Sequence, residues 1–203
     1  HGAAVTALLR QADEHTVVGE PLALRARLAR AAAPVTILKG AVAEEANPFT
    51  GDAVLRRLDV ADPVEVADYG AFEATQVEVA PSAYLVPAGM ASALRLLELH
   101  GIDFRRLAAD TVVTAERFRI DSTRVASEPY EGHRELTLYG HYESARIGVG
   151  AGTALVPLAQ PLGRLAFLLL EPRADDGIVA WNLVDADPGA LDVYPVLRLP
   201  APP

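Results

Sequence analysis

The chain has 203 residues, 51% hydrophobic and 22% charged, so it is long and apolar enough to bury a core as a single globular domain. Its formal net charge of -9 at pH 7 lacks the basic footprint that nucleic acids require and disfavours anionic membrane surfaces, and no stretch approaches the ~20 apolar residues of a membrane span. Cysteine is absent, which excludes disulfide frameworks and thiolate chemistry.

The first part of the chain predicts a helix, three strands and a long irregular region. Apolar residues recur at four-residue spacing over 2–14, which is the pattern of a helix. Near-alternating apolar and Arg positions favour a strand over 22–28, and further strands are expected over 35–38 and 72–80. Residues 44–70 are expected to be an irregular loop that holds short elements or serves a contact. Its turn formers are Asn47-Pro48, Gly51-Asp52, Asp62-Pro63 and Gly70.

The middle of the chain predicts a β-α-β unit around 82–107. A buried strand is expected over 83–86, where four apolar or aromatic residues follow one another. An apolar stripe predicts a helix over 90–100, and Gly101 is suited to cap its C-terminal end. The second strand of the unit is expected over 104–107.

The C-terminal part predicts a long antiparallel pair of strands over 112–125 and 135–147. The glycine-rich run from Gly148 to Gly152 looks like a phosphate loop, but the run that follows it is unsuited to open a helix, so a tight turn between strands is expected. Shorter elements follow: a strand over 154–158, a buried helix beginning at Gln160-Pro161 and reaching Leu170, a short element over 178–184 and a strand over 193–199. The predicted fold class is α+β, a β-dominated sheet or sandwich with two to three helices.

The motifs assign no catalytic residue and no metal ligand. None of the histidines begins a His-x-x-Glu pair; they are His1, His15, His100, His133 and His141. His133 and His141 each stand two residues before a glutamate, but zinc deaminases add paired cysteines to that motif. Five alternating residues are instead expected on the solvated face of one strand: Glu135, Thr137, Tyr139, His141 and Glu143. No Gly-x-Ser-x-Gly elbow marks a serine nucleophile.

The densest cluster of polar and aromatic residues follows the predicted helix that ends at Leu170. Asp175 and Asp176 precede a glycine, which is typical of a turn. Trp181 is the single tryptophan, and a lone Trp is more often a core residue than a ligand platform. A functional patch on this domain is expected first at Asp175, Asp176, Trp181 and Asn182.

Two adjacent segments around this cluster carry a family resemblance. Residues 156–166 run into 169–182, and together they resemble the C-terminal region of bacterial zinc carboxypeptidase-like proteins of the carboxypeptidase A superfamily. Shorter segments look like the same family: 81–87, 97–102, 130–134 and 194–197. The resemblance covers residues 72–199 well and 1–71 weakly.

The resemblance implies that the active site lies elsewhere in the parent protein. In that family the zinc ligands, the substrate-carboxylate arginine and the general-base glutamate belong to an N-terminal catalytic domain, and none of those motifs occurs here. Zinc is therefore expected in an upstream catalytic domain of the same polypeptide, which would be this domain's partner. The implied organisation is a helical arm or linker over 1–20 and a single non-catalytic accessory domain over 21–203. The parent would hydrolyse peptide or amide bonds, and export is common in the family.

Two other functions remain open. A free-standing peptide- or glycan-binding module would work through Trp181, Tyr139 or Tyr142. A small hydrolase with an unrecognised serine or histidine–carboxylate site would lose its activity when His133 or His141 is substituted.

Overall fold

The computed structural model describes residues 2–185 and 190–202. The chain divides into two compact units, one made of His1–Arg25 with Ala74–Pro203 and the other of Ala26–Glu73. The division expected from the sequence, a helical arm or linker over 1–20 from an upstream domain and an accessory domain over 21–203, stays a prediction. Three helices and ten strands, in antiparallel sheets, occur in the part of the chain that the structure describes, which confirms the β-dominated α+β class.

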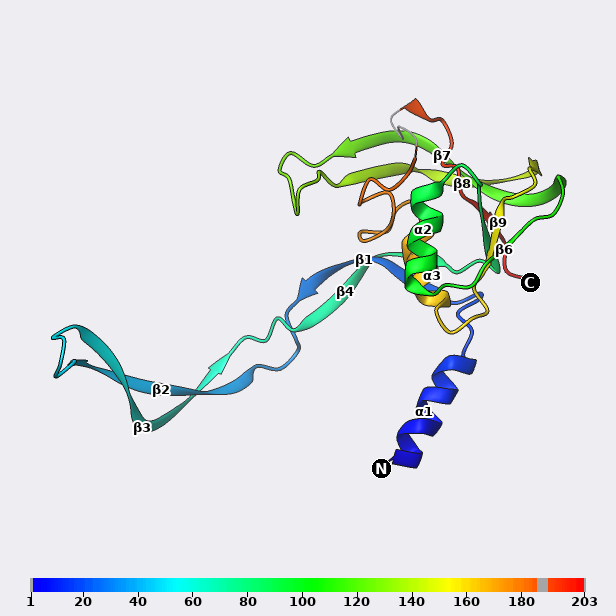
Figure 1. The fold of residues 1–203 in the computed structure, drawn as a ribbon. Coiled ribbons are helices and arrows are strands. Elements are labelled where there is room, and N and C mark those ends of the chain that lie inside the picture. The colour runs from blue at the N-terminus through cyan, green and yellow to red at the C-terminus, as the bar shows by residue number, and fades with distance from the viewer. Residues whose placement is uncertain (1, 186–189, 203) are drawn as a thin grey trace. The chain divides into compact units, whose positions relative to one another are not determined.

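A six-stranded sheet forms the centre of the larger unit, in the order β6-β9-β5-β10-β7-β8. Figure 1 labels β6 and β9 from one end of this order and β7 and β8 from the other. The strands are β5 (Ala83–Val86), β6 (Arg105–Arg106), β7 (Thr111–Val125), β8 (Leu136–Val149), β9 (Ala154–Pro157) and β10 (Leu197–Leu199). Both β5 and β6 run antiparallel to β9, so they are parallel to each other. The expected β-α-β unit is therefore present, with β9 inserted between its two strands.

The predicted long antiparallel pair is β7 with β8, which are in register from Thr111 opposite Val149 to Val125 opposite Leu136. The register shifts between Ile120 and Ser122, where one extra residue makes a bulge. A Cβ on Gly140, opposite Ile120, would lie 1.9 Å from the carbonyl oxygen of Arg119. Only glycine fits this close approach of two backbones.

The two helices of the sheet-bearing unit follow their predicted positions closely. The first, α2 (Ala91–His100), ends at Gly101, which has a left-handed φ of 72°. The N–H of Gly101 donates to Glu98 and that of Ile102 to Leu97, so the last carbonyls of the helix are satisfied. The second, α3 (Gly163–Leu170), begins after Pro161 rather than at it.

The core lies on one face of the sheet, against α2 and α3. Tyr84 and Val86 of β5 belong to it, whereas the intervening Leu85 does not, as the alternation of a strand requires. The helices contribute buried side chains to the same cluster, namely Ala93, Leu94, Leu97, Ala166, Phe167 and Leu170. Leu85 is itself buried on the opposite face of the sheet.

The smaller unit contains an antiparallel hairpin of β2 (Val35–Ala46) and β3 (Ala53–Val66). The expectation of an irregular loop over 44–70 was wrong. Asn47-Pro48 and Gly51-Asp52 build the hairpin tip, where the side chain of Asn47 accepts a hydrogen bond from the N–H of Phe49 (2.9 Å). Pro63 stands inside β3, which the ribbon tolerates because alternate backbone N–H groups of a two-stranded sheet need no partner strand.

Other expectations met mixed outcomes. The predicted helix and strands at the N-terminal side are confirmed as α1 (Gly2–Glu14), β1 (Pro21–Ala29) and β4 (Ala71–Val79), with β1 paired to β4. Residues 178–184 form turns rather than a strand or helix, and the last strand covers only 197–199 of the expected 193–199. Over residues 2–185 and 190–202, no helix is long and apolar enough to cross a membrane.

Candidate functional site

The segment after α3 folds back on that helix and carries the predicted patch. The N–H of Ile178 donates to the carbonyl of Leu169 (2.9 Å), and Ile178 and Val179 are buried beside it. Asn182 has a left-handed φ of 57°, a conformation that asparagine adopts more readily than most residues. The buried pair thus anchors a tight turn whose polar side chains face outward.

Trp181 lines a small pocket of about 190 Å³. Its ring stacks on the imidazole of His133, with centroids 4.4 Å apart and planes 27° from parallel. Its Nε1 donates a hydrogen bond to a carboxylate oxygen of Asp176. The ring is therefore held on one face and at its polar edge, and it is only partly buried. We call this pocket the Trp181 pocket; its lining residues are Tyr130, His133, Glu135, Asp175, Asp176, Ala180 and Trp181.

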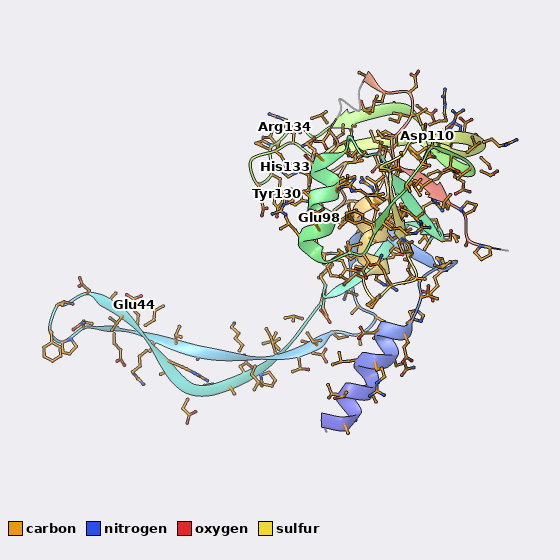
Figure 2. The ribbon with its side chains drawn as sticks, turned by 45° about the vertical axis from the view of Figure 1, so that its right-hand side comes forward. Glu44, Glu98, Asp110, Tyr130, His133 and Arg134 are labelled. Atoms are coloured by element: carbon orange, nitrogen blue, oxygen red, sulfur yellow. The ribbon has the colours of Figure 1, made fainter. Side chains whose placement is uncertain are left out.

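Three of the four predicted patch residues meet in this pocket. Asp175, Asp176 and Trp181 line it, whereas Asn182 turns away and its amide donates to the carbonyl of Arg134 (2.9 Å). The sequence missed the second wall of the pocket, which the turn between β7 and β8 supplies (Figure 2, labels Tyr130, His133 and Arg134). Nothing in the local pattern of that turn indicates the tryptophan that it meets.

The expectation of a plain solvated strand face over Glu135 to Glu143 was wrong in part. β8 begins at Leu136, so His133 and Glu135 precede the strand and are free to line the Trp181 pocket. Thr137 is only 6% exposed. His141 is exposed as expected, 3.4 Å from Asp121.

The Trp181 pocket combines aromatic surface with negative charge. Three carboxylates line it, and the guanidinium of Arg25 lies 3.7 Å from the carboxylate of Glu135 at its border. A tryptophan face attracts cations and sugar C–H groups, and carboxylates accept hydrogen bonds from ammonium, guanidinium and hydroxyl groups. The arrangement therefore suits a cationic or a hydroxyl-rich ligand group rather than an anion.

A second polar cluster lies inside the core, at the end of α3. The carboxylate of Glu171 is fully buried and accepts hydrogen bonds from the hydroxyls of Tyr84 (2.6 Å) and Tyr142 (2.9 Å). The guanidinium of Arg198 on β10 lies 3.4 Å from the same carboxylate and 4.3 Å from the centroid of the Tyr142 ring. Buried charges of opposite sign and two tyrosine hydroxyls therefore join the end of a helix to the C-terminal strand.

The electrostatics of this cluster follow from its burial. Burial raises the pKa of the Glu171 carboxyl, and Arg198 together with the two tyrosine hydroxyls acts against that rise. Burial, reinforced by Glu171, raises the pKa of Tyr84 and of Tyr142 well above the usual value, so both hydroxyls keep their protons and donate. Burial alone would lower the pKa of Arg198, but the neighbouring carboxylate outweighs it and the pKa is raised. Nε and Nη1 of Arg198 are buried and make no hydrogen bond within the described chain, so the guanidinium is held to Glu171 as an ion pair, and the hydroxyl of Tyr142 is already engaged by Glu171.

The described residues do not fit a zinc centre. Catalytic zinc takes three protein ligands, and within residues 2–185 and 190–202 no three His, Asp or Glu side chains gather in a suitable group. His141 with Asp121 is a pair, and His1 lies outside the described residues.

The chain is similar to fungal carboxypeptidases over part of its length. It is 28% identical over 137 residues to carboxypeptidase 2 of Trichophyton equinum and to that of Trichophyton rubrum, a match that covers 68% of this chain and 25% of each relative. It is 30% identical over 114 residues to probable carboxypeptidase 2 of Arthroderma benhamiae, covering 56% of this chain and 22% of that protein.

The chain spans about a quarter of the length of the curated relatives it matches. No family model matches the sequence, and no solved structure gives a significant match. Over the matched residues, this chain is carboxypeptidase-like.

Proposed function

We propose that this chain is a non-catalytic C-terminal accessory region of a bacterial zinc carboxypeptidase-like protein. The similarity to carboxypeptidase 2 over 137 residues is the observation that carries the proposal. The sequence also lacks the His-x-x-Glu pair of a zinc carboxypeptidase, so the ligands would come from another part of the polypeptide. In this arrangement an upstream domain binds zinc and hydrolyses peptide or amide bonds.

The accessory region would act on that catalytic domain by packing against it or by shaping its substrate range. Its partner is therefore the upstream domain of the same polypeptide. Its expected compartment is outside the cytoplasm, because export is common in the family that the sequence resembles. Deleting residues 72–199 from the parent protein is expected to lower its melting temperature or change its ratio of kcat/KM values between peptide substrates. A truncated parent with unchanged stability and unchanged activity on every substrate would contradict the accessory role.

The first experiment uses the 203-residue chain itself. Elemental analysis after dialysis is expected to find no stoichiometric zinc, and a carboxypeptidase assay is expected to find no turnover. Stoichiometric zinc that disappears in a His133→Ala or His141→Ala variant would overturn the non-catalytic assignment. Turnover that survives chelation and is lost in either variant would instead favour a small hydrolase.

A second candidate function is peptide or glycan binding at the Trp181 pocket. The stack of Trp181 on His133 beside carboxylates favours it, because an aromatic face with acceptors at its edge suits cationic peptide side chains and sugars. Trp181 is the only tryptophan, so its fluorescence reports this pocket without interference. A lysine- or arginine-containing peptide, or a neutral oligosaccharide, that quenches the emission saturably would support this function, and unchanged emission with both would contradict it.

A further inference from the structure

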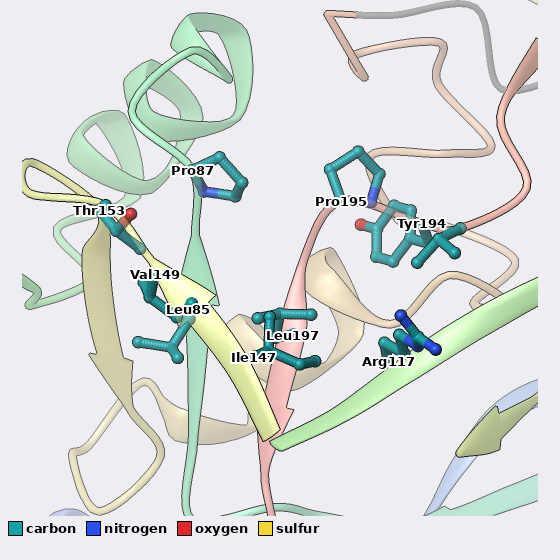
Figure 3. Close-up of a pocket in the computed structure, with 12 residues that line it drawn as sticks. Leu85, Pro87, Arg117, Ile147, Val149, Thr153, Tyr194, Pro195 and Leu197 are labelled. Carbon is teal, nitrogen blue, oxygen red and sulfur yellow. The ribbon is translucent and has the colours of Figure 1, made fainter. Parts of the chain in front are cut away.

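The two units of the chain differ in how their apolar side chains are covered. In the larger unit, Leu85, Ile147 and Leu197 line a cavity of about 500 Å³ together, on the sheet face opposite the core (Figure 3). In the smaller unit every residue of β2 and β3 is exposed or half-buried. The large apolar side chains that this hairpin exposes are Val35, Ile37, Leu38, Val42, Val54, Leu55 and Val60.

A hairpin of this kind is marginally stable by itself. In the described ranges of the chain, β2 and β3 pair only with each other, so their sheet has two strands and two unpaired edges. An isolated two-stranded hairpin buries too little surface to be stable in water, and three or more strands are usually needed. The hairpin is therefore expected to be completed by a further strand.

The two edges of the hairpin differ in how well they accept another strand. β3 contains Pro63, which has no backbone N–H to donate, and its register against β2 shifts between Gly40 and Val42. Prolines and bulges of this kind protect an edge strand from pairing with another chain. β2 has no proline over 35–46 and is rich in apolar residues. The unprotected edge is therefore the β2 edge, by which we mean the backbone groups of β2 that face away from β3.

The order of charges along β2 identifies the strand that fits the β2 edge. When two copies of β2 pair antiparallel about a twofold axis at Val42, residues equally far before and after Val42 stand opposite each other. Lys39 of each copy then faces Glu45 of the other, and the small residues Ala41 and Ala43 face each other beside the axis. Opposite charges directly across two strands attract, so the β2 edge is complementary to a second copy of itself.

Contacts within each hairpin are compatible with this pairing. The Nε of Arg56 donates to one carboxylate oxygen of Glu45 (2.7 Å), so the second oxygen can accept a hydrogen bond from Lys39 of the other copy. Pairing of β3 with its own copy is less favourable. An axis at Asp59 would bring Arg56 opposite Asp62, but it would also place the two Asp59 carboxylates opposite each other. The charges therefore favour β2 over β3 at such a contact.

We propose that the β2 edge is a homodimer interface, at which β2 of one copy pairs antiparallel with β2 of a second copy to make a four-stranded sheet. The same surface serves both copies, as a twofold axis requires. The interface goes beyond the proposed accessory role, because it concerns the assembly of two chains and holds whether or not an upstream domain is catalytic. A contact along one strand edge is small, and small interfaces belong to weak complexes.

Sedimentation velocity of the 203-residue chain measures the association directly. Concentrations from about 1 μM to about 1 mM bracket the dissociation constants of weak dimers. The sedimentation coefficient is expected to rise with concentration from that of a monomer towards that of a dimer, and native mass spectrometry is expected to show two chains. A chain that stays monomeric over the whole range would overturn the proposal.

The absence of cysteine allows the twofold axis to be located. Val42→Cys introduces a single thiol at the axis, where the Cα atoms of the two copies would be about 4.5–5.5 Å apart, within the range of a disulfide. Leu55→Cys is the matched control, because Leu55 lies on β3 and is 71% exposed. Under mild oxidation Val42→Cys is expected to form covalent dimers at least about tenfold faster than Leu55→Cys. Equal rates would contradict an axis at Val42.

An exchange of charges tests the pairing of Lys39 with Glu45. Lys39→Glu and Glu45→Lys each place like charges opposite one another in the homodimer, so each is expected to weaken association at least about tenfold. Mixing the two variants restores both ion pairs, and a heterodimer with nearly the original affinity is expected. Glu65→Lys makes the same change of charge as Glu45→Lys but on β3, and it is expected to leave association unchanged.

Association that neither charge variant weakens, or that their mixture does not restore, would overturn the proposal by placing the contact elsewhere. If a charge variant does not form its hairpin, sedimentation of the unaltered chain and cross-linking of Val42→Cys still decide the question. These measurements are independent of zinc content and of turnover, so their failure is distinguishable from a failure of the proposed accessory function.

Discussion

Replacing Arg198 by methionine removes the cation that pairs with Glu171 in the buried cluster. The side chain of Arg198 is 8% exposed and lies 3.3 Å from Glu116, 3.4 Å from Glu171 and 3.6 Å from Glu78. Methionine keeps an apolar stem of similar length but leaves the carboxylate of Glu171 buried without its cation. Removing one partner of a buried ion pair costs about 3–5 kcal/mol, so the free energy of unfolding is expected to fall by about that amount.

The loss of stability in Arg198→Met is expected to depend on pH, because this substitution leaves the titratable carboxyl of Glu171 buried without its cation. Burial raises the folded-state pKa of Glu171, so the folded protein binds this proton more tightly than the unfolded chain, whose pKa is about 4.3. The stabilisation that protonated Glu171 contributes is therefore complete at a pH below its unfolded-state pKa and is lost as the pH rises through its folded-state pKa. Without Arg198 the folded pKa rises further, so the deficit of Arg198→Met is expected to be smaller at acidic than at neutral pH.

Urea unfolding followed by circular dichroism, at acidic and at neutral pH, measures both effects. Arg119→Met is the matched control, because Arg119 is 41% exposed and its ion pair with Glu143 spans 3.8 Å. That control is expected to change the free energy of unfolding by less than about 0.5 kcal/mol. A loss in Arg198→Met no larger than in the control, or a loss that is equal at the two pH values, would refute the reasoning.

Three further substitutions test the backbone and the Trp181 pocket. Gly140→Ala is expected to lower the urea midpoint strongly, because the new Cβ would lie 1.9 Å from the carbonyl oxygen of Arg119. Gly148→Ala on the same strand is the control: its Cβ meets nothing within 4 Å, so the free energy of unfolding should change by less than about 0.5 kcal/mol. Equal urea midpoints for the two variants would contradict this. Gly101→Ala should cost about 1–2 kcal/mol, because alanine resists the left-handed φ of 72°, and an unchanged melting temperature would argue against it. His133→Ala should move the fluorescence maximum of the single tryptophan to longer wavelength by removing its stacked neighbour, and an identical spectrum would speak against the stack.

The elements that could be predicted from the sequence are those with local signals. The helix before Gly101 has an apolar stripe and a capping glycine, and the pair β7–β8 has long alternating runs separated by turn formers. The hairpin over 35–66 has a weaker signal, because its clustered turn formers are equally typical of irregular structure. Two of the turn-forming pairs make the hairpin tip. Asp62-Pro63 lies inside β3, where a proline is tolerated because alternate backbone N–H groups of a two-stranded sheet have no partner strand.

The residues of the candidate sites are likewise predictable only where they lie close together in the sequence. Asp175, Asp176 and Trp181 were found because they are close in sequence, whereas His133 was missed because the fold alone brings it to the tryptophan. The buried pair of Glu171 and Arg198 has a weak signal in the sequence, because each is a charged residue between apolar neighbours. The sequence pattern does not identify the residue with which such a charge pairs, because that residue lies in another element.

The place of β10 in the sheet has a consequence for how the protein is made. Residues 197–199 are the last strand in sequence, yet they lie between β5 and β7 and join the two halves of the sheet. During synthesis the N-terminal residues emerge first, so β5 and β7 must wait for this strand with their backbone edges unpaired. The sheet is therefore completed only after residues 197–199 have been synthesised, and until then β5 and β7 each present an edge on which a neighbouring nascent chain can add a strand.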